Sequence, residues 1–420
     1  MAVITFGPFS FDAGTARLSR DGVEIRLRPQ AIQVLRVLLQ HRGRSIGYEE
    51  MIAEAWQGTF VSRHTVDVTA GEVKKVLGEY GQWIVNRPKV GYSLDVPSSD
   101  ELVRKGWHFF SRRTREGAER AIECFLEASA QYPGDFKALE GLSTCYLMQA
   151  VFGIRQPLEA YAQFLEAHER AVEAGGLTPE LRSNRAHGLN LFEHRPHEAE
   201  TELLKTLADK PSSGTAHVRL AILYATLGNL DQALASVQRA YEVDPLLPTL
   251  PSTNVNVHVW RGEFDRAIAI GSSAIELHPY LQISRSNYAQ ALEFSGRLQE
   301  ALVQYQLGSM MAGDLPWMRA LEGTCLVKLD RIPEARAILD ELEHRRAREY
   351  YCDAMYMAVL RNALGERAHA LQELERALDE RSPFLHSIDV DPKMQPFRND
   401  PSFTRVRTAL RARWSRGSRE

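Results

Sequence analysis

The chain has 420 residues, of which 44% are hydrophobic and 25% are charged, as in an ordinary globular protein of two or three domains. Its formal net charge of −3 excludes a nucleic-acid polycation, so any surface that binds anions must be local. The four cysteines lie far apart without metal-ligand spacing, which favours reduced thiols.

The N-terminal segment MAVITFGPFSFDAG has no basic stretch followed by an apolar core, so a signal peptide is not expected. Nowhere in the sequence do about 18 uncharged apolar residues follow one another, as a membrane-spanning helix requires. The sequence therefore predicts a cytoplasmic protein without a membrane span.

Residues 1–97 alternate between strand and helix signals. Two short β-prone runs, VITFGPFSFD and ARLSRDGVEIRLRP, come first, and the second contains an Asp-Gly turn. QAIQVLRVLLQHRGR then has apolar residues at helical spacing and a glycine past its end, and YEEMIAEAW is a second short helix. The pattern predicts an α+β domain.

The segment from Thr65 to Gly78 predicts a two-sided helix. Four apolar residues at spacings of 4, 3 and 4 share the side that should pack on the core: Val66, Ala70, Val73 and Leu77. The opposite side carries small, polar and basic residues with one valine among them: His64, Val68, Gly71, Glu72 and Lys75, flanked by Thr69 and Lys74.

The side that carries Val68 has the properties of a helix that enters the major groove of DNA. Small side chains allow close approach, cations meet phosphates, and an aliphatic group can contact the methyl of thymine. The alternative is that Val68 is an ordinary solvent-exposed residue, which is common on protein surfaces.

A strand pair with a basic tip, WIVNRPKVGYSLDV, follows directly. Arg87 and Lys89 flank Pro88 at the tip, where they could contact phosphates or a narrow minor groove. Taken singly, two cations in a loop are also explained by a solvated turn.

These segments together resemble the OmpR/PhoB-type winged-helix DNA-binding domain. The matching features are GVEIRLRPQAIQVLRVLLQHRGRSIGYEEMIAEAW, HTVDVTAGEVKKVLG and IVNRPKVGYSLDV, in the order and spacing of that family. The resemblance implies that the helix starting at Thr65 is the recognition helix and that Arg87 to Gly91 is the wing. Contacts with double-stranded DNA are then expected from nine residues: His64, Thr65, Val68, Thr69, Glu72, Lys74, Lys75, Arg87 and Lys89.

Two features depart from the family pattern. Where the family often has arginine this chain has Glu72, which could accept from the amino group of cytosine or bridge to Lys74 or Lys75. Residues 1–97 contain 12 Lys and Arg against 10 Asp and Glu, a net charge of only +2. We therefore expect modest affinity per monomer, with a homodimer or cooperating partners adding to it.

A repeat of 34 residues appears in the second part of the chain. Gly228, Gly262 and Gly296 are 34 residues apart, as are Pro211, Pro245 and Pro279. The alanines hold the same step, and the last follows at 35: Ala199, Ala233, Ala267, Ala301, Ala335 and Ala370. The period resembles a tetratricopeptide (TPR) array, in which a small alanine lets two helices cross closely and neighbouring pairs must stack to bury their faces.

These patterns divide the chain into an α+β winged helix-turn-helix domain and an all-α TPR solenoid. We expect the winged helix at 1–97, a linker at 98–103, about seven helix pairs at 104–400, and an arginine-rich C-terminal helix and tail at 401–420. The combination resembles HilA-like regulators and cytosolic relatives of CadC-like regulators of bacteria.

The first helices of the repeats should line the concave face of the array. By phase this face includes five candidate partner-binding residues: Asn256, Trp260, Gln290, Trp317 and Asn362. Their partner would be a protein or peptide, with RNA polymerase or a second copy of the chain as alternatives.

The sequence contains no phosphate-binding glycine loop and no catalytic or metal-ligand constellation, so no enzyme activity, cofactor or metal is expected. It favours a transcriptional regulator that binds promoter DNA through residues 1–97 and a partner or signal through the array. The alternative is a TPR scaffold whose winged helix serves as a protein-interaction module. Gly71, Glu72 and the low net charge of residues 1–97 favour this alternative.

Overall fold

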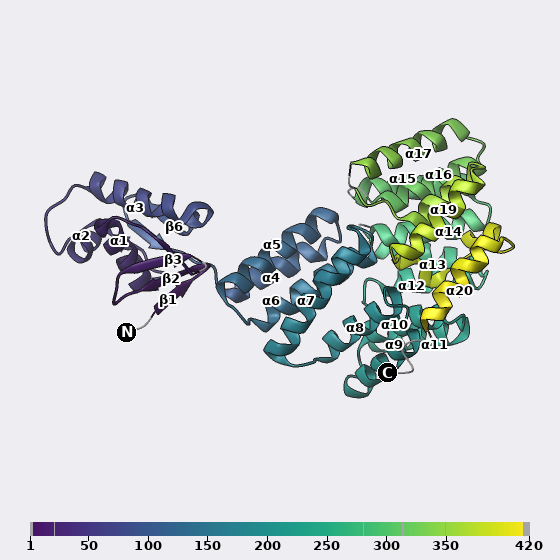
Figure 1. Ribbon diagram of the computed structural model, residues 1–420, viewed down its shortest axis with the longest axis horizontal. Coiled ribbons are helices and arrows are strands. Elements are labelled where there is room, and N and C mark those ends of the chain that lie inside the picture. Colours follow the sequence, from purple (N-terminus) through teal and green to yellow (C-terminus); the bar gives the residue numbers. More distant parts are fainter. Residues whose placement is uncertain (1–2, 21, 280, 313–314, 349, 415–420) are drawn as a thin grey trace. The chain divides into compact units, whose positions relative to one another are not determined.

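The computed structural model describes residues 3–20, 22–279, 281–312, 315–348 and 350–414 (Figure 1). It divides into two compact units. The first unit contains residues 1–106 and 123–138, and the second contains residues 107–122 and 139–420.

The first unit begins with a four-stranded antiparallel sheet in the order β1-β2-β3-β4. Its apolar side chains, such as Phe6, Phe9 and Phe11, are buried because alternate residues of each strand point to one face. The strands are short: β1 (Val3–Phe6), β2 (Phe9–Asp12), β3 (Arg17–Arg20) and β4 (Val23–Ile25).

Three helices and a second sheet complete the α+β winged-helix fold, as the sequence predicted. The helices are α1 (Pro29–Gln40), α2 (Tyr48–Ala55) and α3 (Arg63–Leu77). The second sheet has the order β5-β7-β6 and consists of β5 (Ile46–Gly47), β6 (Ile84–Arg87) and β7 (Gly91–Leu94), with the short helix η1 (Gly78–Trp83) before β6.

Helix α3 is fixed at its start and along its apolar side. The Ser62 hydroxyl caps it by accepting from the backbone N–H of Thr65 at 3.2 Å. The apolar side packs into the core of the first unit, and all four residues predicted to face the core are fully buried: Val66, Ala70, Val73 and Leu77. The opposite side of α3 is therefore the one that remains accessible.

The expected linker at 98–103 is not a loop in the structure. Helix α4 (Ser99–Ser111) begins there, and α5 (Arg115–Gln131) follows it. Tyr132, just after α5, donates from its hydroxyl to the Pro97 carbonyl and accepts from Arg42, both at 3.3 Å. The first unit thus extends beyond residue 97 because the end of the first helix pair hydrogen bonds to the winged helix.

The helices from α4 to α19 form eight consecutive pairs within the described residues, against about seven expected. Each of the later pairs packs on the next, which gives the TPR-like solenoid that the 34-residue period predicted. After α4 and α5 the pairs are α6 (Phe136–Val151) with α7 (Pro157–Gly175), α8 (Pro179–Leu191) with α9 (Pro196–Asp209), α10 (Gly214–Thr226) with α11 (Leu230–Val243), α12 (Leu250–Trp260) with α13 (Phe264–Leu277), α14 (Gln282–Phe294) with α15 (Leu298–Ala312), α16 (Pro316–Lys328) with α17 (Ile332–Ala347), and α18 (Ala354–Ala363) with α19 (Arg367–Asp379).

The repeated residues have the roles that their spacing indicated. The six alanines of the period lie in the second helices and are fully buried, where a larger side chain would push two helices apart. The three turn glycines have φ of 77°, 76° and 87°, which L-residues with a side chain rarely adopt: Gly228, Gly262 and Gly296.

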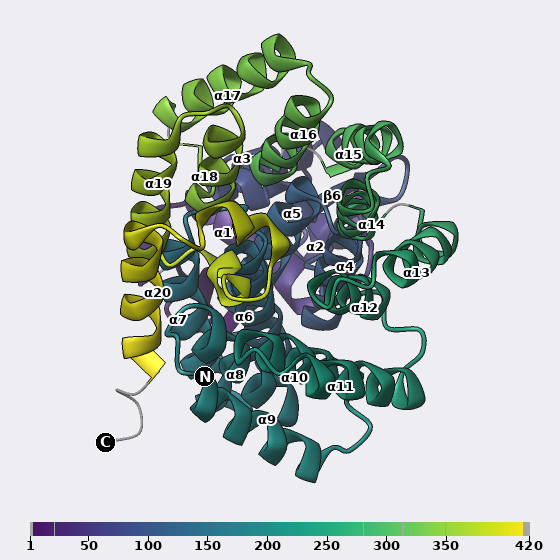
Figure 2. The same cartoon turned by 90° about the vertical axis from the view of Figure 1, so that its right-hand side faces the viewer.

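The last described segment begins with η2 (Pro383–Ser387) and η3 (Pro392–Phe397), which return to the inner side of the array (Figure 2). It ends with α20 (Pro401–Trp414), which packs on α19. Figure 2 shows η2 and η3 inside the curve of helices, where η2 contacts α8 and α10. Arg381 donates to the carbonyl of Phe192 at 3.2 Å, so residues 189 positions apart in the sequence meet.

Helix α20 carries the first arginines of the predicted C-terminal tail. Arg407 and Arg411 bind the carboxylate of Asp389 at 2.5 and 2.6 Å, so they hold α20 to the segment before it. Residues 415–420 lie outside the described residues.

Candidate nucleic-acid interface and array cavity

One row of exposed residues runs along the accessible side of α3. His64, Val68, Gly71 and Lys75 follow one another at spacings of 4, 3 and 4 and are all exposed, and Val68 has 51% of its surface accessible. Lys75 has no hydrogen-bond or ion-pair partner among the described residues. This side of the helix therefore offers a cation, a small aliphatic group and a bare stretch of backbone.

Three other residues predicted to contact DNA are engaged within the domain. Thr69 lies on the buried side of α3, against our expectation, and its hydroxyl donates to the Thr65 carbonyl at 2.8 Å. Thr65 is half-buried, with its hydroxyl 3.0 Å from that of Ser62. The Lys74 ammonium lies 6.0 Å from the ring centre of Tyr92, a cation–π distance.

Glu72 pairs with neither of the lysines that the sequence suggested. Its carboxylate accepts from Nε of Arg28, at 2.8 and 2.9 Å, and also from the Nη2 group of the same residue. The hydrogen bonds from Arg28 hold the pKa of the Glu72 carboxyl below its usual value. The negative charge on the candidate DNA face is thus balanced by a cation from the start of α1.

The wing is a tight turn between β6 and β7. The N–H of Val90 donates to the Arg87 carbonyl at 2.9 Å, and Lys89 occupies the third position of the turn with φ of 67°. Lys89 is exposed and has no ion-pair partner among the described residues, whereas Arg87 binds Asp95 at 2.9 Å. Lys89 is therefore the cation of the predicted pair that has no ion-pair partner among the described residues.

Gly91 closes the wing and cannot be replaced without moving the backbone. Its φ is 139°, and a Cβ atom there would lie 1.9 Å from the carbonyl oxygen of Ile46 in β5. This close approach lets β7 pair with β5 on one side and β6 on the other.

Asp67 connects α3 to the rest of the domain, which the sequence did not reveal. Its carboxylate accepts from the Tyr48 hydroxyl at 2.9 Å and from the Tyr92 hydroxyl at 2.7 Å. Asn86 in β6 donates to the same Tyr92 hydroxyl at 3.0 Å, so the network includes the wing strands. The only sequence signal was Tyr92 in the Gly-Tyr pair, and the partner of its hydroxyl lies 25 positions away.

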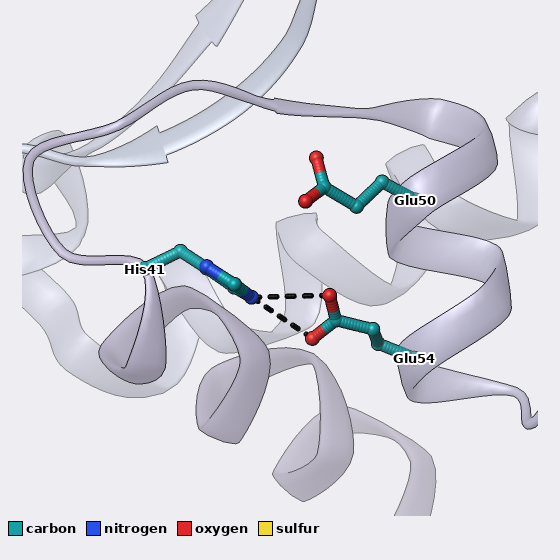
Figure 3. Close-up of side chains that lie close together, drawn as sticks. All are labelled: His41, Glu50 and Glu54. Atoms are coloured by element: carbon teal, nitrogen blue, oxygen red, sulfur yellow. Dashed lines mark hydrogen bonds and ion pairs between the residues drawn. The ribbon is translucent and has the colours of Figure 1, made fainter.

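His41, Glu50 and Glu54 form the one group of metal-ligating side chains that the described residues bring together (Figure 3). The imidazole Nε2 lies 2.9 Å from Glu54, while Arg44 binds Glu50 at 2.6 Å and His41 Nδ1 at 2.8 Å. The guanidinium of Arg44 thus already contacts two of these three side chains, Glu50 and His41. The cluster is satisfied as an ion-pair network between α1 and α2 and does not favour a metal ion.

The second unit contains a cavity of about 580 Å³ on the inner side of the array. Four of the five candidate partner-binding residues line it: Asn256, Trp260, Gln290 and Trp317. The fifth, Asn362, is not among its lining residues and instead accepts from Arg367 at 2.7 Å. The cavity is of the size that encloses small organic ligands.

Several of these side chains also hold the array together. The indole N–H of Trp317 donates to the Phe152 carbonyl at 3.1 Å, and Gln290 accepts from Lys393 of the C-terminal segment. Asn256 has no side-chain hydrogen bond among the described residues. Trp107 and Phe110 from α4 also line the cavity.

Among the residues that the structure describes, no helix is both long enough and apolar enough to cross a membrane.

Residues 22–94 match a family of known proteins described as "Transcriptional regulatory protein, C terminal". The transcriptional activator CadC of Escherichia coli is 29% identical over 99 residues, which are 23% of this chain and 19% of that protein. Superkiller complex protein 3 of Mus musculus is 25% identical over 272 residues, which are 63% of this chain and 16% of that protein. The chain thus spans less than a fifth of the length of these curated relatives.

Among solved structures, the human IFIT1 dimer with m7Gppp-AAAA is similar with a TM-score of 0.50 and 15% identity, over 83% of this chain and 90% of that one. A monomeric IFIT1 mutant with Gppp-AAAA gives a TM-score of 0.51 and 14% identity, over 91% of this chain and 90% of that one. At this identity the likeness concerns the fold alone.

The domains found are regulatory and scaffold domains, and no catalytic family is among them. A domain of this family implies DNA-binding transcriptional regulation, and TPR-like repeats imply interaction with proteins. The chain therefore combines an OmpR/PhoB-type winged helix, which matches the regulatory family over residues 22–94, with a TPR-like array of paired helices.

Proposed function

We propose that the chain is a transcriptional regulator that binds promoter DNA with the accessible side of α3 in the major groove and with the wing on the phosphate backbone. The observation that carries the proposal is the exposed row on α3, which ends in the unpaired Lys75, together with the exposed Lys89 at the wing tip. On this proposal the protein acts in the bacterial cytoplasm, where promoter DNA lies.

The residues of this surface have different roles in the proposal. Lys75 and Lys89 neutralise phosphates, which positions the domain without reading the sequence. In this proposal Val68 contacts a thymine methyl, and the absence of a side chain at Gly71 lets the helix backbone approach the bases. His64 is exposed at the start of the helix, where it can donate to a phosphate.

The role proposed for the array is to bind a partner or a signal on its inner side. Asn256 and Trp260 are the strongest candidates of the predicted set, because both line the cavity and Asn256 keeps its amide free of other hydrogen bonds among the described residues. The partner of the array would be RNA polymerase or a second copy of the chain. A homodimer would raise the affinity for DNA, to which a net charge of +2 on the winged-helix domain contributes little.

The test measures binding of the full chain to duplex DNA by fluorescence anisotropy over a series of salt concentrations. Lys75→Ala and Lys89→Ala should weaken binding to all duplexes by similar factors, and each should reduce the slope of log K against log salt by about one. Val68→Ala should instead change the preferred base at one position of sequences selected from a random pool.

The matched control is Lys205→Ala, which removes an exposed lysine from α9 in the array. It should leave both the affinity and the salt slope unchanged. Failure of the full chain to bind any duplex at low salt, or an equal loss in all three lysine variants, would show that this surface does not contact DNA.

The alternative function is a scaffold whose winged helix docks on a protein. The observation that favours it is Phe60, which lies in the loop between α2 and α3 with 94% of its surface exposed. Such a side chain is free to contact a partner, and aromatic residues are enriched at protein interfaces. Absence of DNA binding in the test above, combined with intact folding, would support this alternative.

A further inference from the structure

Arg219 in α10 is a buried cation whose hydrogen bonds go only to neutral groups. Its guanidinium donates to the Ser183 hydroxyl at 2.6 Å and to the side-chain carbonyl of Asn184 at 2.5 Å. Asn184 in turn donates to the Thr144 hydroxyl at 3.2 Å. A guanidinium has five N–H donors, so this neutral network leaves part of its hydrogen-bonding capacity and all of its charge uncompensated.

Burial alone accounts for the electrostatics of Arg219 and lowers its pKa to about 10. Within the described part of the chain no carboxylate is hydrogen bonded or ion paired to it. A buried charge normally has a partner of opposite sign, because removing an ion from water without one is costly. Arg219 lines the cavity, so the missing partner can come from a ligand.

The acidic side chains that line the cavity do not supply that partner. Asp391 binds Lys393 at 2.7 Å and Glu180 binds Lys210, so two of the four are paired locally. Burial raises the pKa of the Glu140 carboxyl, and this carboxyl makes no hydrogen bond or ion pair to Arg219 among the described residues. Asp244 packs against the backbone of Gly214 at the start of α10.

Arg113 is a second cation of this cavity without a carboxylate partner among the described residues. Burial lowers its pKa, and its guanidinium lies 4.7 Å from the ring centre of Phe110. Arg219 and Arg113 are thus two cations of the cavity to which no lining carboxylate is hydrogen bonded or ion paired among the described residues.

Two histidines connect Arg219 to the aromatic part of the cavity. The pKa of His187 lies well below its ordinary value. Burial is the largest cause, and the nearby Arg219 and His386 lower it further. The His386 ring in turn packs edge-on against Trp260 with centroids 6.0 Å apart. His187 is buried and His386 is half-buried, and both have lowered pKa values, so they are neutral near pH 7 and Arg219 is the charged group beside them.

The wall beyond Trp260 is aromatic. Trp317, Tyr356 and Phe384 pack together with ring centroids between 4.7 and 5.7 Å apart. Such a wall offers flat apolar surface on which a planar group can stack. Phe384 belongs to η2, so the C-terminal segment itself builds one side of the cavity.

This segment also decides between a peptide and a small molecule. An extended peptide would need the inner side of the array along several repeats, but η2 and η3 lie there and bind α8, α10 and Gln290 (Figure 2). What remains is a partly open cavity of about 580 Å³, a volume that suits a small organic ligand.

We propose that the cavity of the array binds one small organic anion, with its carboxylate or phosphate on Arg219, Ser183 and Asn184 and its flat apolar body among the aromatic side chains. The proposed function assigns the array a partner or a signal, and this proposal rests on it only by identifying that signal as the small anion. It does not require DNA binding.

The test uses isothermal titration calorimetry on the full chain without DNA. Four probes separate the parts of the proposed ligand: 2-naphthoate, 2-naphthyl phosphate, the neutral 2-naphthamide and inorganic phosphate. At least one of the two naphthyl anions should bind with a stoichiometry of one and be at least about ten-fold tighter than 2-naphthamide, since hydrogen bonds to a charged group are the stronger ones. Comparison of the two anions tells whether a carboxylate or a phosphate is preferred.

Arg219→Gln should remove this preference by lowering the affinity for the anion about ten-fold while leaving that for 2-naphthamide unchanged. Arg239→Gln, which changes an exposed arginine on α11, should bind as the unaltered chain does. If Arg219→Gln does not fold, the comparison of the four probes on the unaltered chain still decides, and Arg219→Lys tests the site with its charge kept.

The proposal is overturned if no naphthyl probe binds, if 2-naphthamide or inorganic phosphate binds as tightly as the naphthyl anions, or if Arg219→Gln and Arg239→Gln behave alike. Because DNA is absent from the titration, a failure here is distinct from a failure of the DNA-binding proposal, which the lysine variants test separately.

Discussion

Arg28 and Glu72, which are 44 positions apart, form a two-pronged ion pair between the start of α1 and the accessible side of α3. Both carboxylate oxygens of Glu72 lie within 2.9 Å of the Arg28 Nε. Arg28 remains largely exposed while Glu72 is mostly covered. The Glu72 carboxylate lies on the face that we propose to contact DNA phosphates. The ion pair with Arg28 explains how this is possible, because the arginine neutralises its charge.

Glu72→Gln should therefore strengthen binding to duplex DNA. The substitution removes a negative charge from the proposed interface and releases Arg28 from its partner. We expect a rise in affinity of a few-fold at low salt and a salt slope steeper by about one, measured by anisotropy on an arbitrary duplex. Arg28→Gln should have the opposite effect, because it leaves the Glu72 carboxylate uncompensated.

Glu79→Gln is the matched control for this charge change. Glu79 also pairs with an arginine, Arg20 at 3.2 Å, but lies in η1 beyond the end of α3. It should leave the salt slope as it is. An equal rise in affinity for both glutamine variants would mean that net charge, and not the position of Glu72, controls binding.

Gly91→Ala and Gly71→Ala should change stability in opposite directions. At Gly91 a Cβ would meet the Ile46 carbonyl at 1.9 Å in a backbone conformation that alanine avoids, so we expect a loss of at least about 3 kcal/mol. At Gly71 nothing lies within 4 Å of the added methyl, and helix propensity predicts a gain of about 0.5–1 kcal/mol. Denaturant unfolding of the full chain measures both, and a neutral Gly91→Ala would contradict the register of β5 with β7.

Ala267→Leu tests the packing of the repeats. Ala267 in α13 is fully buried where helices cross, so three extra carbons should cost on the order of 1–3 kcal/mol by overpacking. Ala269→Leu is the control, since Ala269 is exposed on the same helix. Thermal unfolding should show a lower midpoint for Ala267→Leu alone, and similar midpoints for the two variants would refute the assigned phase of the repeat.

Asp353→Asn tests a buried carboxyl that anchors the C-terminal segment. Asp353 caps α18 and accepts from the Ser382 hydroxyl at 2.7 Å, which holds the chain just before η2. Burial raises the pKa of Asp353 to about 6, and its hydrogen bonds to Ser382, Tyr351 and two backbone N–H groups oppose this only in part.

The sign of the pH effect follows from the raised pKa. Between about pH 4 and pH 6 the folded chain keeps a proton that the unfolded chain releases, so this stabilisation is complete below about pH 4 and is lost as the pH rises through 6. Relative to Asp353→Asn, the unaltered chain should lose up to about 3 kcal/mol over this interval. Urea unfolding at several pH values measures the difference. Asp379→Asn, an exposed control on α19, should show the same dependence of stability on pH as the unaltered chain. If Asp353→Asn also shows that dependence, the Asp353 carboxyl is not buried.

The sequence by itself determined the features that depend on local periodicity. Val66, Ala70, Val73 and Leu77 had to share one side of a helix because 3.6 residues make a turn, and the structure buries all four. The 34-residue step of Ala233 and its counterparts likewise determined the paired helices, because each pair must bury the same face against the next.

Only the tertiary structure decided which distant residues meet. Glu72 binds Arg28 instead of the neighbouring lysines, and Asp67 accepts from Tyr92. Both contacts form because α3 packs near α1 and β7, which brings these side chains within hydrogen-bonding distance. The first helix pair joined the winged helix where a linker was expected, because Tyr132 reaches Pro97 and Arg42.

The cavity is the clearest case of this kind. Arg219 has no feature in the sequence that marks it as a buried cation with neutral partners. Its surroundings arise because small rotations accumulate over the repeats until the C-terminal segment meets α8 and α10, with Arg381 at Phe192 across 189 positions. No local pattern encodes such a sum of rotations, so the repeat unit can be read from the sequence, whereas the residues that line the cavity are decided by the tertiary structure.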